Sequence, residues 1–469
     1  MSKDISITYL SELYRLMIAE LREPRVCRAQ NSSLLLALNE HMRSIYDKYW
    51  GEQRQATVVD LSDEEMLWAE YEKAAAAYAN ALNAQATIAT CYSSMAEYWQ
   101  DVRDQECGKS ENTIWDIYEH GSRRRLESTF ADELNVQSAL LLNSGMSAIS
   151  VAMSAIGLKS SDHVLVGKSS YFETNEVLEH FSGVTGCQVH SIDFLNISAF
   201  EDALKDLSPK LLMVEVATNC PTPVLLPDFS QVDFGANVPI MICDQTIVGF
   251  PSEAISLKYP GDVIYLASLS KFVTNSISAG LIFGQASNIN VCRKIARFSG
   301  QNLQERAFNF IRNSDIACVG YRMEIHRRNV RLFANELAQV KSSLSLFRVL
   351  GRDYLDDSSH ESDINGCLIF LALRSSAGRD NFAPELVERH RAVVNSWRDF
   401  SLRRGGSVDI RSGFGWRRTS IRCYEGSQLN QPDAPLYIRI SVGLESRNAA
   451  MCLAGRLVES IREVSCEII

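Results

Sequence analysis

ALLLNSGMSAISVAMSAI, residues 139–156, decides the class of fold. An apolar run of strand length passes through Ser144, Gly145 and Met146 and continues with the apolar spacing of an amphipathic helix. A strand that leads straight into a helix is typical of an α/β sheet. Small residues at the start of such a helix let its backbone N–H groups approach a phosphate, although a plain strand-to-helix turn has the same composition.

Working outward, short apolar runs alternate with helical patterns between about residues 136 and 285. This alternation predicts βαβ units, and hence a mainly parallel seven-stranded sheet with helices on both faces. The seven runs are SALLLNSG, DHVLVGKSS, CQVHSIDF, KLLMVEVATN, VPIMICDQT, DVIYLASLS and AGLIFGQ.

We expect three regions: one before the alternating pattern, one that contains it, and one after it. Residues 1–114 form a helical N-terminal segment and connector, because stretches such as EEMLWAEYEKAAAAYANALNAQATIA are rich in helix formers. Residues 115–290 form the large domain. Residues 291–469 form a smaller α+β domain that contains CLIFLAL, the strand-like LYIRISVGL and a terminal helix from Asn448.

Composition narrows the class of partner. The chain has 47 Lys and Arg against 57 Asp and Glu, a net charge of −10, which gives no electrostatic reason to expect nucleic acid or an anionic membrane. Twelve scattered cysteines form no CxxC pair, so we expect reduced thiols and no metal site. The N-terminus has no secretory pattern and no apolar run reaches about twenty residues, which predicts a soluble, cytoplasmic protein.

Asp244 ends an almost wholly apolar strand in PIMICDQT, residues 239–246. Ligands bind at the carboxyl ends of strands in an open α/β sheet, so polar residues there are candidates for a site. A buried carboxylate needs a cationic partner, and a protonated pyridine nitrogen would supply one. The alternative is an aspartate that caps a helix or a turn.

Lys271 follows the next apolar strand in DVIYLASLSKFV, together with Ser268 and Ser270. A lysine at a strand end either extends to solvent or forms an imine, and serine hydroxyls are natural phosphate donors. Two further strand ends carry Tyr171 and Asn219. An aromatic ring can stack on a heteroaromatic plane, and an amide can bind a phenolic oxygen.

These motifs together resemble the Cys/Met-metabolism family of pyridoxal 5′-phosphate (PLP) enzymes, the group of cystathionine γ-synthase, cystathionine γ-lyase and methionine γ-lyase. The similarity runs from about Trp115 to the C-terminus. It implies PLP fold type I, PLP bound to the large domain, and a homotetramer built from dimers with active sites at the subunit interface. The matching segments, in the family's order, are SGMSAI, YFET, EVATN, CDQT, SLSK, RMEIHRRNVRLFANEL and YIRISVGLES.

The resemblance implies a role for each site residue. Lys271 would carry the cofactor as a Schiff base and shuttle protons, Asp244 would hold the pyridine nitrogen, and Asn219 would contact the phenolic oxygen. Tyr171 would stack on the ring and assist proton transfer to the leaving group. The expected substrate ligands are Arg439, whose planar fork suits the α-carboxylate, and Ser412. The expected phosphate ligands are Ser144, Gly145, Met146, Ser268 and Ser270.

Some features depart from the family pattern. The family has Y-x-R-x-x-N-P-T, whose tyrosine and arginine reach the neighbouring subunit's phosphate, where this chain has WDIYEHGSRRRLE. Tyr118 and one of Arg123 to Arg125 are the candidates for that role. The family's G-H-S-D after the lysine is replaced here by residues 275–278, and the helical N-terminal segment is longer. The resemblance therefore implies the cofactor more strongly than the substrate.

The implied reaction is γ-elimination or γ-replacement on an L-amino acid with a Cγ leaving group, such as cystathionine, methionine or an O-acylhomoserine. One alternative is a γ-lyase that expels halide from a chlorinated unsaturated amino acid to form a terminal alkyne such as propargylglycine. Another is a β-lyase of cystathionine or cysteine. A non-catalytic PLP-fold regulatory partner is the alternative from another class, and the retention of Lys271, Asp244 and Arg439 favours an enzyme.

Overall fold

The computed structural model describes most of the chain from residue 121 to residue 466. The gaps are 169, 218, 220, 222–228, 249–257, 274–276, 305–306, 309–310, 312–316, 350–351, 354–365, 376–383, 404–417 and 425–435. The helical segment and connector predicted over residues 1–114 lie outside the described residues. No described helix is long and apolar enough to cross a bilayer.

A seven-stranded sheet forms the centre of the large domain, with the strand order β1-β7-β6-β5-β4-β2-β3. The strands are β1 (Ser138–Leu142), β2 (His163–Gly167), β3 (Gln188–Ile192), β4 (Leu211–Glu215), β5 (Ile240–Asp244), β6 (Val263–Ser268) and β7 (Gly280–Gly284). Every pair is parallel except those of β7, which runs antiparallel to both β1 and β6. The predicted mainly parallel sheet is confirmed, with a strand at each of the seven predicted runs.

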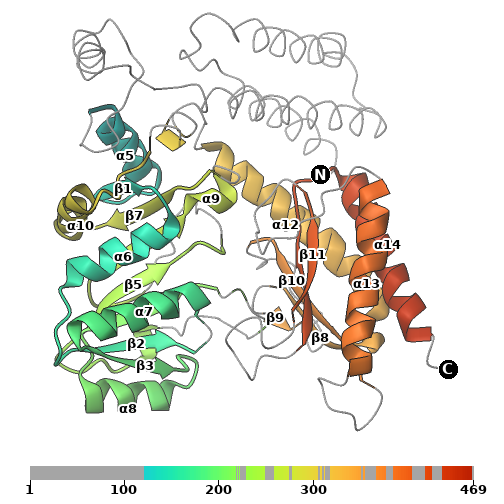
Figure 1. Ribbon diagram of the computed structural model, residues 1–469, viewed down its shortest axis with the longest axis horizontal. Helices are drawn as coiled ribbons and strands as arrows, with labels where there is room; N and C mark the ends of the chain where they lie inside the picture. Colours follow the sequence, from blue (N-terminus) through green and yellow to red (C-terminus); the bar gives the residue numbers. More distant parts are fainter. Residues whose placement is uncertain are drawn as a thin grey trace, which may run out of the picture.

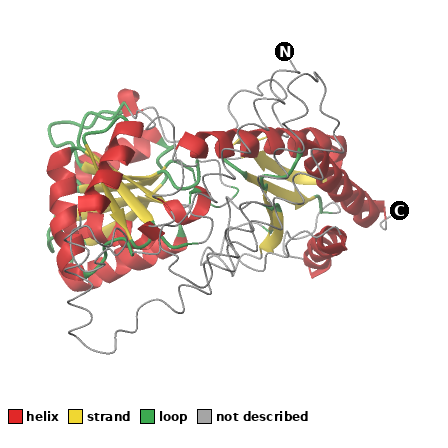
Figure 2. Ribbon diagram, turned by 90° about the horizontal axis from the view of Figure 1, so that it is seen from above, coloured by secondary structure: helices red, strands yellow, loops and turns green. Residues whose placement is uncertain are grey.

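Helices cover both faces of this sheet (Figures 1 and 2). One face packs against α6 (Gly145–Ile156), α7 (Phe172–Thr185) and α10 (Ala286–Ser299), and the other packs against α5 (Gly121–Glu133) and α8 (Ile197–Leu207). Neighbouring residues of a strand point to opposite faces, as Leu140 and Leu141 of β1 do. Because both faces are buried, the strands are apolar nearly throughout, except for the more exposed edge strand β3.

Strand β1 is an edge strand, and side chains satisfy its outer backbone groups. Glu127 of α5 accepts the N–H of Leu141 at 2.9 Å, and Arg293 of α10 donates to the carbonyl of Ala139 at 2.9 Å. Arg293 and Glu127 also form a buried ion pair. Burial raises the pKa of Glu127, and the Arg293 charge opposes this shift. The strand that leads to Ser144 is therefore held from both sides.

The small domain is a five-stranded antiparallel sheet with the order β11-β12-β10-β8-β9. Its strands are β8 (Leu344–Val349), β9 (Arg352–Asp353), β10 (Leu368–Leu373), β11 (Ser420–Tyr424) and β12 (Tyr437–Ser441). One face is covered by α12 (Ala317–Leu337), α13 (Pro384–Arg403) and α14 (Arg447–Cys466) (Figure 2). The predicted α+β character is confirmed. The boundary expected at residue 290 falls within α10, and that helix packs with the large domain.

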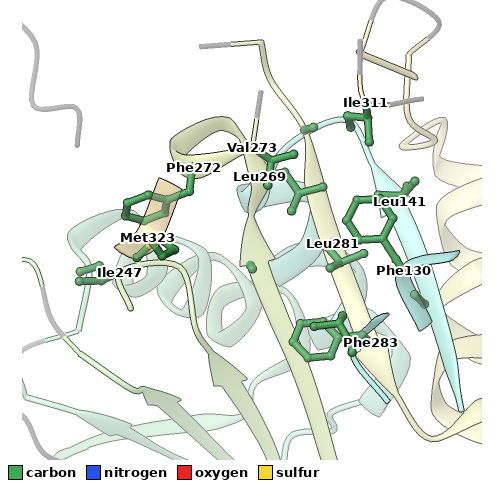
Figure 3. Close-up of a cluster of buried hydrophobic side chains, with 14 of the residues drawn as sticks. Phe130, Leu141, Ile247, Leu269, Phe272, Val273, Leu281, Phe283, Ile311 and Met323 are labelled. Atoms are coloured by element: carbon green, nitrogen blue, oxygen red, sulfur yellow. The ribbon is translucent and has the colours of Figure 1, made fainter. Parts of the chain in front are cut away.

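The two domains share one apolar core. Figure 3 shows Phe272 of the short helix α9 (Leu269–Phe272) beside Met323 of α12 and Ile247. The same cluster contains Phe370 and Tyr437 from the small-domain sheet. The ring of Phe272 also meets the ring of His326 edge-on at 5.5 Å. Helix α9, which carries Lys271, is therefore fixed against the small domain.

Candidate active site

Five candidate residues lie where strands end at one edge of the large sheet. Glu215, Asp244 and Ser268 are the last residues of β4, β5 and β6. Ser144 and Tyr171 follow β1 and β2 and are the N-cap residues of α6 and α7. Since these strands run in the same direction, their ends gather the residues that the sequence places far apart.

The start of α6 packs tightly against the end of β6. Ser144 caps the helix, and its Oγ accepts the N–H of Ser147 at 3.0 Å. A Cβ on Gly145 would lie 2.7 Å from the Cβ of Ser268. A Cβ on Gly280 would lie 2.0 Å from the carbonyl oxygen of Ser144. Only glycine fits at both positions, so the N–H groups of α6 lie directly beside the Ser268 side chain.

Hydroxyl groups surround this helix end. The Oγ atoms of Ser268 and Ser270 lie 2.8 Å apart, and the N–H of Ser268 donates to Oγ1 of Thr246 at 2.8 Å. The positive end of the α6 dipole and several hydroxyl donors together suit a phosphate group. Sequence reasoning assigned no role to Thr246, although its place two residues after Asp244 was visible.

Two carboxyl groups lie side by side, because Glu215 of β4 pairs with Asp244 of β5. Desolvation raises the pKa of Asp244 to about 6, although hydrogen bonds from Thr246 and the charge of Lys271 lower it. Desolvation and Asp244 raise the pKa of Glu215 to about 8, against a hydrogen bond from the Tyr171 N–H at 2.6 Å. Burial therefore raises the pKa of both carboxyl groups, and the Lys271 charge favours ionisation of Asp244. Glu215 belongs to the predicted run KLLMVEVATN, but sequence reasoning assigned it no role.

Tyr171 lies at the start of α7, and its ring meets the ring of Phe172 edge-on at 4.8 Å. Desolvation, followed by the nearby Glu173, Glu215 and Tyr424 groups, raises the pKa of the Tyr171 phenol well above its usual range. The phenol is therefore neutral across the physiological range.

Arg439 reaches the large domain from strand β12. It is 2% exposed, and its Nη1 donates to Oδ1 of Asn219 at 2.6 Å. Its guanidinium carbon lies 4.9 Å from the centroid of the Tyr424 ring. Arg348 of β8 donates to the carbonyl of Pro221 at 2.5 Å. Two arginines of the small domain thus contact the segment that follows β4.

Helix α12 holds the segment after β12. The amide of Asn329 donates to the carbonyls of Gly443 at 3.0 Å and Glu445 at 2.9 Å, and Asn329 is fully buried. The Nδ1 of His326 lies 2.7 Å from the carbonyl oxygen of Val442. The two motifs that the sequence singled out in the small domain therefore bind each other, and together they support Arg439.

The remaining predicted site residues differ in where the structure places them. Met146 is the second residue of α6, and its side chain packs on the apolar core, which leaves its backbone for a ligand. Arg123 is buried and donates to the carbonyl of Leu303 at 2.8 Å, whereas Arg124 and Arg125 are exposed. Tyr118 and Ser412 lie outside the described residues.

The donor set fits a cofactor with a phosphate, a basic ring nitrogen and an aldehyde. The start of α6 with Ser268 and Ser270 suits the phosphate. The desolvated Asp244 carboxylate suits a protonated ring nitrogen, and Lys271 lies near enough to lower the Asp244 pKa. In the described part of the chain, no group of three or more His, Cys, Asp or Glu side chains is arranged to hold a metal ion.

A scan against protein-family models matches residues 74–360 to the family described as Cys/Met metabolism PLP-dependent enzyme. The chain belongs to this family. Its members are PLP-dependent enzymes, so PLP is the cofactor of this chain. The match begins within the N-terminal segment, before the Trp115 at which we placed the start of the similarity, and ends before Arg439.

Solved structures confirm the fold, PLP fold type I. Cystathionine gamma synthase from Xanthomonas oryzae pv. oryzae is 16% identical with a TM-score of 0.58, covering 76% of this chain and 92% of that one. CalE6, a methionine gamma lyase from Micromonospora echinospora, is 15% identical with a TM-score of 0.57, covering 72% and 86%. A putative O-acetylhomoserine (thiol)-lyase from Campylobacter jejuni is 14% identical with a TM-score of 0.58, covering 79% and 93%. No curated protein sequence matches the chain.

Proposed function

We propose that the chain catalyses γ-elimination or γ-replacement on an L-amino acid that carries a leaving group at Cγ. One observation carries the proposal. The Asp244 carboxylate and the Lys271 amine lie near each other at one edge of the large sheet, and Arg439 of the small domain donates to Asn219, which follows the neighbouring strand β4. Together they provide a cofactor anchor, a base and a carboxylate ligand.

Each group has a defined task in this proposal. The start of α6, with Ser144, Ser268 and Ser270, binds the phosphate. Asp244 holds a proton on the ring nitrogen, and Tyr171 and Asn219 orient the ring and its phenolic oxygen. When bound, PLP stabilises negative charge that develops on the substrate carbons next to the amine.

Lys271 is both the covalent attachment point of the cofactor and the base. With substrate bound, its Nζ would move protons at Cα and Cβ of the substrate. The neutral phenol of Tyr171 donates its proton to a departing thiolate or alkoxide. Arg439 binds the substrate α-carboxylate with its planar fork, and Asn219 fixes the direction of that fork.

A substrate screen tests the reaction class. Purified holoenzyme is incubated with cystathionine, methionine, O-acylhomoserines, cysteine and a γ-chlorinated unsaturated amino acid, and released ammonia, thiol and halide are measured. Turnover of the Cγ substrates that Lys271→Ala abolishes supports the proposal. Turnover confined to cysteine or to β-cleavage of cystathionine would instead assign a β-lyase. Halide release with formation of an alkyne would assign the specialised γ-lyase.

We further propose a homotetramer built from dimers in the cytoplasm. Arg124 and Arg125 of α5 are exposed, which supports a contact with a neighbouring subunit, whereas Arg123 is held inside its own chain. The buried thiols of Cys187, Cys243 and Cys292 form no disulfides, in keeping with a reducing compartment. Light scattering of the holoenzyme measures the number of subunits.

A further inference from the structure

A row of three arginines crosses the small-domain sheet. Arg348 of β8 pairs with Phe370 of β10, Phe370 pairs with Arg439 of β12, and Arg439 pairs with Arg422 of β11. Residues paired directly across strands project from the same face of a sheet. The opposite face, which packs under the helices, carries Ile369, Ile421, Ile438 and Ile440.

This row faces the large domain. Its neighbours on the same face, Tyr424 and Tyr437, belong to the core that the two domains share. Arg348 and Arg439 both donate to the segment that follows β4, at the carbonyl of Pro221 and at Oδ1 of Asn219. The third arginine of the row, Arg422, is therefore on the face that forms the wall of the active site.

Arg422 and Arg439 are held close together. Their guanidinium carbons lie 5.1 Å and 4.9 Å from the centroid of the same Tyr424 ring. That ring is 3% exposed and stacks on Tyr437 at 5.2 Å with an angle of 10° between the planes. Like charges directly opposite in a sheet destabilise it, so an anion between or beside them lowers the cost of the pair.

Arg439 and Arg422 differ in their burial and in their hydrogen bonds within the protein. Arg439 is buried and donates to Asn219, which fixes its position. Arg422 is partly exposed, and among the described residues it makes no hydrogen bond or ion pair. Its guanidinium carries five N–H donors, and their planar fork matches a carboxylate.

We propose that Arg422 binds a second carboxylate of the substrate, beside the α-carboxylate that Arg439 holds. This inference rests on the proposed role of Arg439. It assigns as substrate class the dicarboxylic L-amino acids whose side chain or Cγ leaving group ends in a carboxylate. Tyr424 positions both arginines, since its ring contacts both guanidinium groups.

The test is equilibrium binding to the holoenzyme, with two pairs of ligands that lack a Cγ leaving group. L-Glutamate and L-glutamine have the same shape and differ in the charge at the end of the side chain. The pair L-2-aminoadipate and L-homoglutamine repeats the comparison with one more methylene. Affinity is read by calorimetry and by the change in visible absorbance, for native protein, Arg422→Gln, Arg422→Lys and Arg439→Gln. Arg391→Gln is the control, because Arg391 is exposed on α13 and pairs with Glu388.

A hydrogen bond between charged groups contributes about 1.5–3 kcal/mol, which corresponds to roughly 10- to 100-fold in affinity. We expect Arg422→Gln to weaken binding of the carboxylate ligand by that factor and to leave the amide ligand within about threefold. Arg422→Lys should recover part of the lost affinity. Arg439→Gln should weaken the binding of both ligands, and Arg391→Gln should leave the binding of both unchanged.

Two results would overturn the inference. One is equal affinity of native protein for the carboxylate and the amide at both chain lengths. The other is an equal loss for both ligands in Arg422→Gln, which would mean that Arg422 contacts only the α-carboxylate. Because neither ligand can undergo γ-elimination, a preference for the carboxylate that depends on Arg422 would stand even if the substrate screen failed.

Discussion

Replacing Gly145 with alanine changes the contact between α6 and β6 directly. The added Cβ would lie 2.7 Å from the Cβ of Ser268 and 3.2 Å from its Cα. Carbon atoms pack at about 3.5–4.0 Å, so the helix end or Ser268 has to move by about 1 Å. Ser268 resists this movement, because its N–H donates to Thr246 and the residue pairs with Gly280 in β7. We therefore expect the helix end to move away.

Two effects follow from that movement. Overpacking costs about 1–3 kcal/mol of unfolding free energy, and the smaller conformational freedom of alanine offsets about 0.5–1 kcal/mol of it. A hydrogen bond of ordinary length that is stretched by about 1 Å is lost. Losing one bond between the phosphate and either the α6 N–H groups or Ser268 would weaken PLP binding by roughly 10- to 100-fold.

The assay is titration of the apoprotein with PLP, followed by tryptophan fluorescence, together with urea unfolding of the same samples. Gly455→Ala is the matched control, because Gly455 lies within α14 and a Cβ there would meet nothing within 4 Å. That control should leave PLP affinity unchanged and increase stability by about 0.5–1 kcal/mol. If Gly145→Ala bound PLP as tightly as the native protein, the phosphate would not lie at the start of α6.

Asp244→Asn removes a buried negative charge that destabilises the folded apoprotein. Desolvation raises the pKa of Asp244 from 3.8 to about 6, so the stability of the native apoprotein falls as pH rises through that range, by about 3 kcal/mol at neutral pH. In urea unfolding, the variant apoprotein should be more stable than the native apoprotein at neutral pH and equally stable below about pH 4. Equal stability of the two proteins at both pH values would contradict this prediction. Asn329→Leu leaves the buried carbonyls of Gly443 and Glu445 without their amide donor and should cost about 2–4 kcal/mol in thermal unfolding. The exposed Arg391→Ala should cost less than about 0.5 kcal/mol, and a similar small loss in both variants would refute the role of Asn329.

Six of the seven strands of the large sheet could be predicted because they are buried on both faces, whereas the edge strand β3 is more exposed. Burial makes these six strands nearly continuous apolar runs, which stand out between amphipathic helices. The direction of a strand, by contrast, produces no pattern in the sequence. AGLIFGQ reads alike in either direction, and the reversal of β7 emerges only from its pairing with β1 and β6. The boundary predicted at residue 290 falls within α10, because a helical pattern does not say which domain the helix packs on.

The site was predictable where one residue interrupts an apolar pattern, as Asp244 and Lys271 do. Other parts depend on contacts between distant segments. The pKa of Glu215 is raised by burial and by Asp244, which the register of β4 and β5 places beside it. Arg422 lies beside Arg439 because β11 pairs with β12. Neither relation has a local pattern in the sequence, since strand register is set by packing of the whole domain.

The most direct test of the central claim is the absorbance spectrum of the purified protein before and after borohydride reduction, with peptide mapping of the product. We predict a visible yellow band that borohydride removes, and a pyridoxyl group on Lys271. A colourless protein that takes up no added PLP, or a pyridoxyl group on a different lysine, would contradict the assignment of this site.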